Sequence, residues 1–197
     1  GLGAPGGGIE AELVEVEVDI GPGLPAFHIV GLPDTMVTES KERVRAAVRN
    51  SGCDFPMRRI ACNLAPADVP KAGPSFDLPI ALGVVIASDQ LLVDTTKSLF
   101  LGELSMDGRL RPTHGILPMV TLARDKGLHD VYVPLEGAHE ASLVDGVRVF
   151  PVSTFAGLSC AWAVAPLIAG IGSSTRRSTK SGRLSARSVE TVTRQPA

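Results

Sequence analysis

The strongest constraint on the fold is a strict alternation of apolar and acidic residues near the start of the chain. Val14, Val16, Val18 and Ile20 alternate with Glu15, Glu17 and Asp19. A period of two places the apolar side chains on one face of a β-strand and the acidic side chains on the other. Residues 10–20 are therefore predicted to form a half-buried strand. Gly21-Pro22-Gly23 ends it, and residues 26–30 are predicted to form a short returning strand.

Two helices with different surroundings are predicted next. Asp34 can cap a helix over residues 35–50. On this helix Val37, Val44 and Val48 share one stripe, and Lys41, Arg45 and Arg49 share another. A second helix, from Ser75 to about Ser88, is almost continuously apolar, which predicts a buried central position. Residues 59–64 between the two helices are predicted to form a strand.

The second half of the chain mixes short strands and helices. Asp107-Gly108 between apolar runs is a strong hairpin signal. Helices are predicted at residues 116–126, 138–144 and 154–165, the last ending at Pro166, and strands at 131–133 and 147–152. This order predicts an α/β or α+β fold with a mixed sheet packed against helices.

Composition narrows the class of protein. The 197 residues are 44% hydrophobic, enough for one domain with a core, and the net charge of −2 excludes a polycation that coats nucleic acid. Cys53, Cys62 and Cys160 form no C-x-x-C pair, which argues against a disulfide framework and a structural zinc site. A reducing cytoplasm fits this pattern, and no signal peptide is visible. The start at Gly1 instead of methionine suggests a fragment or an incomplete reading frame.

The two ends of the chain differ from its middle. Residues 1–8 are predicted to be a flexible lead-in, 9–165 a single domain, and 166–197 a Ser/Arg-rich disordered tail. A frameshift would explain the tail, and so would a genuine stand-alone variant. Residues 149–175 contain no Asp, Glu, Lys or Arg, so a membrane tether over residues 149–172 is an alternative to a buried C-terminal helix.

The chemistry-bearing motifs are few. No segment matches the phosphate-binding pattern G-x-x-x-x-G-K-[ST], and the four histidines are scattered, so no cofactor or metal site is predicted. Ser75 stands at the start of the apolar helix, where the helix field suits a nucleophile or an oxyanion. A plain N-cap serine is the alternative, and the absence of a neighbouring base favours it.

A family resemblance rests on several long motifs in a fixed order. They are Gly23-Leu24-Pro25-Ala26-Phe27, Ile29-Val30-Gly31-Leu32-Pro33-Asp34, Glu42-Arg43-Val44-Arg45-Ala46-Ala47, Asn63-Leu64-Ala65-Pro66-Ala67-Asp68 and Phe76-Asp77-Leu78-Pro79-Ile80-Ala81-Leu82. Together they resemble the N-terminal domain of the magnesium-chelatase-like AAA+ ATPases, the YifB/ComM competence-protein group. The Gly-Pro-Ser turn at Ser75 and the segment 100–112 also resemble Lon-type proteases.

The resemblance implies a Lon-protease-like fold of the type seen in domain two of ribosomal small-subunit protein five. It also implies that a catalytic lysine would stand at Leu117, and a leucine cannot take a proton from Ser75. Lys71, in the preceding loop, is expected to be solvated. Ser75 is therefore interpreted as a helix cap at a vestigial nucleophile position.

The resemblance further implies a non-catalytic domain that serves ring assembly or contact with DNA or a partner. Complete relatives are expected to bind ATP and Mg²⁺, to form homo-hexameric rings and to act in DNA branch migration during competence. A Ser–Lys hydrolase and a membrane-tethered adaptor are the alternatives. Arg45 and Arg49 are candidate DNA contacts, and a solvated helix face is the competing and favoured interpretation.

Overall fold

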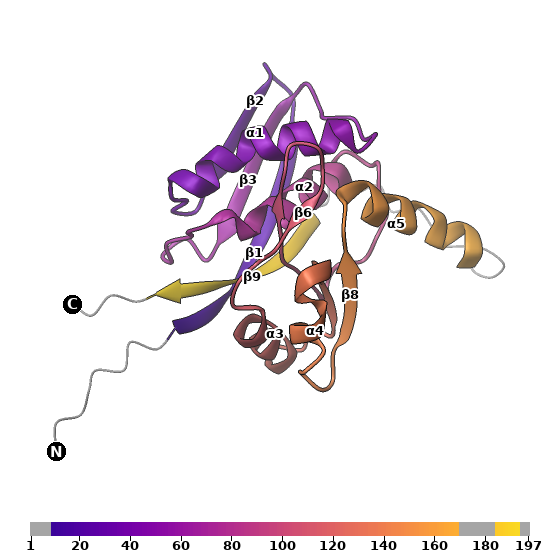
Figure 1. The fold of residues 1–197 in the computed structure, drawn as a ribbon. Coiled ribbons are helices and arrows are strands. Elements are labelled where there is room, and N and C mark those ends of the chain that lie inside the picture. Colours follow the sequence, from indigo (N-terminus) through magenta and orange to yellow (C-terminus); the bar gives the residue numbers. More distant parts are fainter. Residues whose placement is uncertain (1–8, 170–183, 194–197) are drawn as a thin grey trace.

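The computed structural model describes residues 9–169 and 184–193, and the side chains of residues 11–162. The predicted lead-in and the tail segments 170–183 and 194–197 lie outside the described residues. The elements follow the order β1 (Ile9–Gly21), β2 (Ala26–Val30), α1 (Thr35–Asn50), β3 (Arg59–Ala65), η1 (Pro74–Phe76), α2 (Asp77–Ala87), β4 (Ser98–Phe100), β5 (Glu103–Leu104), β6 (Leu110–Arg111), α3 (Ile116–Asp125), β7 (Asp130–Pro134), η2 (Leu135–Gly137), α4 (Ala138–Ala141), β8 (Arg148–Val152), α5 (Phe155–Ala169) and β9 (Leu184–Thr193). The fold is mixed α/β, with helices packed on the sheets (Figure 1).

The largest sheet has the strand order β2-β3-β1-β9. Strands β1 and β3 are antiparallel, whereas β2 and β3 are parallel and joined through α1, as a βαβ unit requires. The segment 26–30 therefore runs in the opposite direction to β1, as a returning strand does, but it does not pair with β1, because β3 lies between them. The local sequence does not decide this strand order, because β1 and β2 both have apolar faces that could pair beside each other. The order is set when the strands pair in the folded protein.

The alternating strand behaves as its sequence predicts. Val14, Val16 and Val18 are buried in the main core with α1 and α2. The helix α2 approaches closely, since a Cβ at Gly83 would lie 2.6 Å from Val18 Cγ2. Strand β3 adds Ile60, Cys62 and Leu64 to the same core, as predicted.

A second, smaller layer is built from the parallel strands β4, β7 and β8. One face of this sheet packs against α3 and α4 around Leu99, Val131 and Val133. The predicted hairpin is confirmed as β5–β6. At its turn, Asp107 Oδ1 accepts hydrogen bonds from Ser105 Oγ and the Arg109 N–H, and Gly108 has φ 87°.

The helix predictions hold at most boundaries. Helix α1 spans the predicted residues, and Asp34 Oδ1 accepts a hydrogen bond from the Val37 N–H at 2.7 Å. The predicted end of the last helix at Pro166 is wrong, because α5 continues to Ala169. A proline removes one helical hydrogen bond without having to end the helix.

The tail also departs from the prediction of disorder. Residues Leu184–Thr193 form β9, which pairs with β1 in antiparallel register. Its Val189, Thr191 and Thr193 are β-branched residues that suit a strand, and β1 offers an edge for pairing. In the described part of the chain, no helix has the length and apolar character needed to cross a membrane. The uncharged stretch begins in β8 and continues in α5, and residues 170–172 lie outside the description.

Candidate functional site

Ser75 lies in the short turn η1, ahead of α2. Its carbonyl accepts a hydrogen bond from the Gly102 N–H at 3.4 Å, and the residue is half-buried. The capping role predicted for Ser75 is wrong. The N-cap of α2 is Phe76, and no side chain caps the helix. The physical reason is the 3₁₀ turn, which moves the start of α2 past Ser75.

Lys71 is fully buried, so the prediction of a solvated lysine is wrong. Its backbone bridges Pro33: the Lys71 N–H donates to the Leu32 carbonyl at 3.0 Å, and its carbonyl accepts from the Asp34 N–H at 2.9 Å. Its amine donates to the Pro66 carbonyl. These backbone hydrogen bonds hold the loop against residues 32–34, so the Lys71 side chain packs inside the protein. No sequence pattern indicates that this lysine is buried.

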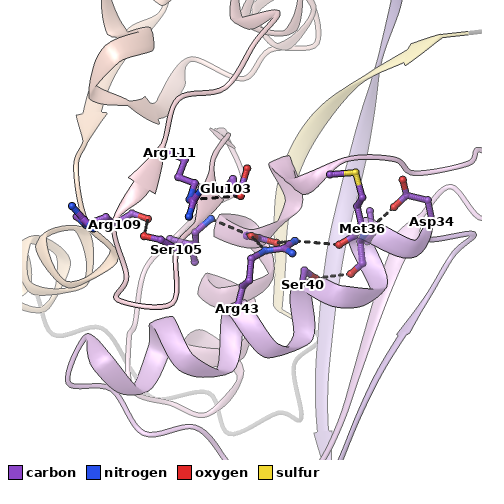
Figure 2. Close-up of polar contacts among 11 residues, drawn as sticks. Asp34, Met36, Ser40, Arg43, Glu103, Ser105, Arg109 and Arg111 are labelled. Atoms are coloured by element: carbon purple, nitrogen blue, oxygen red, sulfur yellow. Dashed lines mark hydrogen bonds and ion pairs between the residues drawn. The ribbon is translucent and has the colours of Figure 1, made fainter.

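The best-defined polar contact of the core joins α1 to α2. Arg43 binds Asp77 with two hydrogen bonds, Nε to Oδ2 at 2.7 Å and Nη2 to Oδ1 at 3.1 Å, and Arg43 also donates to the Met36 carbonyl (Figure 2). Asp77 Oδ2 also accepts from the Leu104 N–H at 3.1 Å. The Asp77 side chain is 0% exposed. The sequence analysis missed this pair, although a single aspartate in an otherwise apolar helix is a usable signal.

The surroundings of Asp77 favour the protonated form of its carboxyl group. Burial raises the pKa of Asp77 to about 6, and the hydrogen bonds from Arg43 and Leu104 only partly offset this rise. The same pair raises the pKa of Arg43. A carboxyl buried between three elements and held on both oxygens is a structural link. It leaves no oxygen clearly available for proton transfer to a ligand.

A cleft of about 610 Å³ lies along the β5–β6 hairpin, and neither Arg43 nor Asp77 lines it. Its walls include Arg109, which pairs with Asp107 at 2.7 Å. They also include Arg111, which pairs with Glu103 at 3.8 Å (Figure 2). Glu136 and the exposed Leu135 also line it. Alternating cations and acids give this cleft no dominant charge, and Ser75 is not among its lining residues.

Leu117 lies in the first turn of α3 and is 40% exposed. Its N–H donates to Glu140 Oε1 at 2.8 Å. With Ala11, Pro118, Thr121 and Leu122, it lines a shallow, mainly apolar hollow of about 520 Å³. Ser75 lies outside this hollow as well, so neither cleft brings Ser75 and Leu117 together.

The two candidate DNA contacts lie on α1. The Arg45 guanidinium lies 5.3 Å from the centroid of the Phe55 ring, and Arg49 Nη2 lies 3.6 Å from the Met57 sulfur. Across the described side chains, no ion pair holds either arginine. Arg49 is exposed beside the exposed Met57, whereas Arg45 is half-buried against Phe55.

Metal ligands do not gather in the structure as far as it is described: no three His, Cys, Asp or Glu side chains there could hold one ion. The three cysteines are free thiols. Burial raises the pKa of the Cys62 thiol to about 12, so this thiol stays protonated in the core.

The fold and its motifs define a class, and sequence comparison supports it. Lon protease 2 of Bacillus subtilis is 30% identical to the chain over 123 residues, which are 61% of this chain and 22% of that protease. This similarity agrees with a Lon-protease-like fold. The chain belongs to the family described as subunit ChlI of Mg-chelatase, whose profile matches residues 16–137. The family expected from the motifs is thus confirmed.

Two relatives are more similar to the chain. The competence protein ComM of Haemophilus influenzae is 43% identical over 148 residues, and an uncharacterized protein of Mycobacterium tuberculosis is 47% identical over 148 residues. In both cases the match covers 75% of this chain and 29% of the relative. The chain therefore spans less than a third of the length of the curated relatives it matches.

Proposed function

We propose that this chain is the non-catalytic N-terminal domain of a magnesium-chelatase-like AAA+ ATPase, serving ring assembly or contact with DNA or a partner protein. One observation carries the proposal: the match to ComM is strong but covers 29% of that protein. The remainder of such a relative has room for the ATPase module. In this proposal the complete protein works on DNA in the cytoplasm as a homo-hexameric ring.

ATP and Mg²⁺ belong to the complete protein in this proposal. The sequence has no G-x-x-x-x-G-K-[ST] segment, so its residues do not fit the usual cradle for the phosphates of ATP. This domain would then supply surfaces to the ring, while the ring supplies the ATP chemistry. ATPase activity of the chain alone would contradict this division.

The non-catalytic part of the proposal rests on Leu117. A Ser–Lys mechanism needs an amine that accepts the serine proton, and Leu117 lines an apolar hollow instead. The test is a peptidase assay on the wild-type chain and on Ser75→Ala, with the exposed Ser142→Ala as the matched control. We expect no turnover from any of them. Cleavage that disappears only in Ser75→Ala would establish the hydrolase alternative instead.

The DNA contact is tested at Arg45 and Arg49. Phosphate contacts release counterions, so binding should weaken as salt rises. We expect the Arg45→Glu/Arg49→Glu double variant to lose this binding, and Lys126→Glu, at the exposed end of α3, to retain it. If wild-type binding does not depend on salt, the DNA contact is wrong and ring or partner assembly remains.

A further inference from the structure

Three aromatic rings stack across the parallel sheet, one from each strand. The ring centroids of Phe100 and Tyr132 lie 4.9 Å apart, and those of Tyr132 and Phe150 lie 4.7 Å apart. The ring planes are tilted by only 20° and 13°. Trp162 of α5 meets Phe100 and Tyr132 edge-on, at 5.7 and 5.2 Å. Trp162 thus packs against the side of the ladder at its two inner rings.

The outer end of the ladder is open. Phe100 is 0% exposed and Tyr132 is 8% exposed, but Phe150 is 37% exposed. Phe150 lies on β8, the edge strand of this sheet. One face of its ring rests on Tyr132. An exposed, rigidly held ring face at the end of a stack can accept another planar ring.

A cation lies two residues away on the same face of β8. Arg148 is paired with Asp130 through Nε–Oδ1 at 2.6 Å and Nη2–Oδ2 at 2.8 Å, and its side chain is 73% exposed. These bonds use two of its five N–H donors, so the guanidinium is oriented but not saturated. Residues i and i+2 of a strand are about 6.6 Å apart. That separation allows one ligand to place a ring on Phe150 and an anion at Arg148.

We propose that Phe150 and Arg148 form a binding site for single-stranded nucleic acid, in which a base stacks on Phe150 and a neighbouring phosphate binds Arg148. This inference deepens, and rests on, the nucleic-acid part of the proposed function, but it uses a different surface from Arg45 and Arg49. A duplex is excluded from this site because its bases are already stacked on one another.

Other occupants fit the surface less well. An added β-strand is disfavoured because Pro151 of β8 has no N–H to donate. Phe150 lines neither of the two clefts described above, so no cleft wall would enclose a free nucleotide there. Such a nucleotide would be held only by stacking on one face of the Phe150 ring. A strand can add contacts at neighbouring residues, as sequence-tolerant stacking platforms do.

The experiment uses the single tryptophan of the chain. Trp162 touches the ladder, so its fluorescence should respond to a base placed on Phe150. The probes are a short single-stranded oligodeoxynucleotide, its abasic counterpart, the matching duplex and adenosine monophosphate. We expect the single strand to bind most tightly and to change the Trp162 emission.

The variants separate stacking from charge. Phe150→Ala should weaken binding of the single strand about tenfold or more, whereas Phe150→Tyr should retain it. Phe150→Leu keeps an apolar side chain without a π-face and should behave like Phe150→Ala if the fold tolerates it. Arg148→Met should lower the slope of log K against log salt by about one. The matched control is Leu92→Ala, an 82% exposed apolar residue outside the ladder.

Several results would overturn the site. They are unchanged binding in both Phe150→Ala and Phe150→Leu, equal binding of the abasic strand, or equal binding of adenosine monophosphate. If only the Arg45→Glu/Arg49→Glu variant loses binding, this site is wrong and the proposed DNA contact stands. If wild-type protein binds none of the probes, both are wrong, while the assembly role is untouched.

Discussion

Two arginine–aspartate pairs in this chain have nearly the same geometry and opposite surroundings. Arg43 grips Asp77 in the core between α1, α2 and β5, with bonds of 2.7 and 3.1 Å. Arg148 grips Asp130 at the edge of the second sheet, with bonds of 2.6 and 2.8 Å. The Asp77 side chain is 0% exposed and that of Asp130 is 21% exposed, while the Arg43 side chain is 20% exposed and that of Arg148 is 73% exposed.

The difference teaches that geometry alone does not assign a role to an ion pair. In the core, removing one partner leaves a charge without water or a counterion, so the pair holds the elements in place. At the surface, water screens the pair, and the pair contributes little to stability. The exposed guanidinium keeps donors that a ligand can use. The predictions below test this contrast from its largest effect to its smallest.

The largest effect is expected for Arg43→Met. It leaves Asp77 buried without its cation, which should lower the free energy of unfolding by about 3 kcal/mol at neutral pH. Urea unfolding measures the loss. A loss no larger than that of Arg148→Met would remove the contrast between the two pairs.

The second effect is a pH dependence that belongs to the core pair. The folded-state pKa of Asp77, about 6, lies above its ordinary value of 3.8, so the folded protein holds more protons between these values. The contribution of Asp77 to the free energy of unfolding should therefore fall as the pH rises from about 4 to about 6. The measurement is unfolding of wild type and Asp77→Asn across this range. If the difference between them does not change with pH, the raised pKa is wrong.

A third, intermediate effect is expected for Asp34→Ala beside the core pair. Asp34 caps α1 through the Val37 N–H and also accepts from the Gly73 N–H at 3.2 Å. Losing the cap should cost about 1 kcal/mol in thermal or urea unfolding. Asp34→Asn keeps one acceptor oxygen, which can still cap the helix through the Val37 N–H, but it loses the bond from Gly73, so it serves as the control for capping. An equal loss in both variants would show that the charge or the Gly73 bond, not the cap, stabilises this turn.

The smallest effect on stability is expected for Arg148→Met. Because water screens its ion pair, the unfolding midpoint should stay within experimental error of wild type. Thermal unfolding in low and high salt measures it. The same variant should change the salt dependence of oligonucleotide binding, so a change in stability without a change in binding would reverse the role assigned to this pair.

Much of the local structure could be predicted because its causes are local. The valine alternation before Ile20, the Asp34 cap and the Asp107-Gly108 turn each act within a few residues. The family motifs also identified the class of the protein. The candidate site was harder to predict from the sequence. In the structure Ser75 does not cap α2, and Lys71 is buried instead of solvated.

The sequence by itself determined the strand periodicity, the main helices and the family, because side-chain spacing and turn chemistry act over short stretches of chain. Only the tertiary structure decided that β3 separates β2 from β1, that Arg43 reaches Asp77 across 34 residues, and that Phe150 ends an aromatic ladder. These contacts join distant segments. Their energies depend on burial, which arises only when the layers pack together.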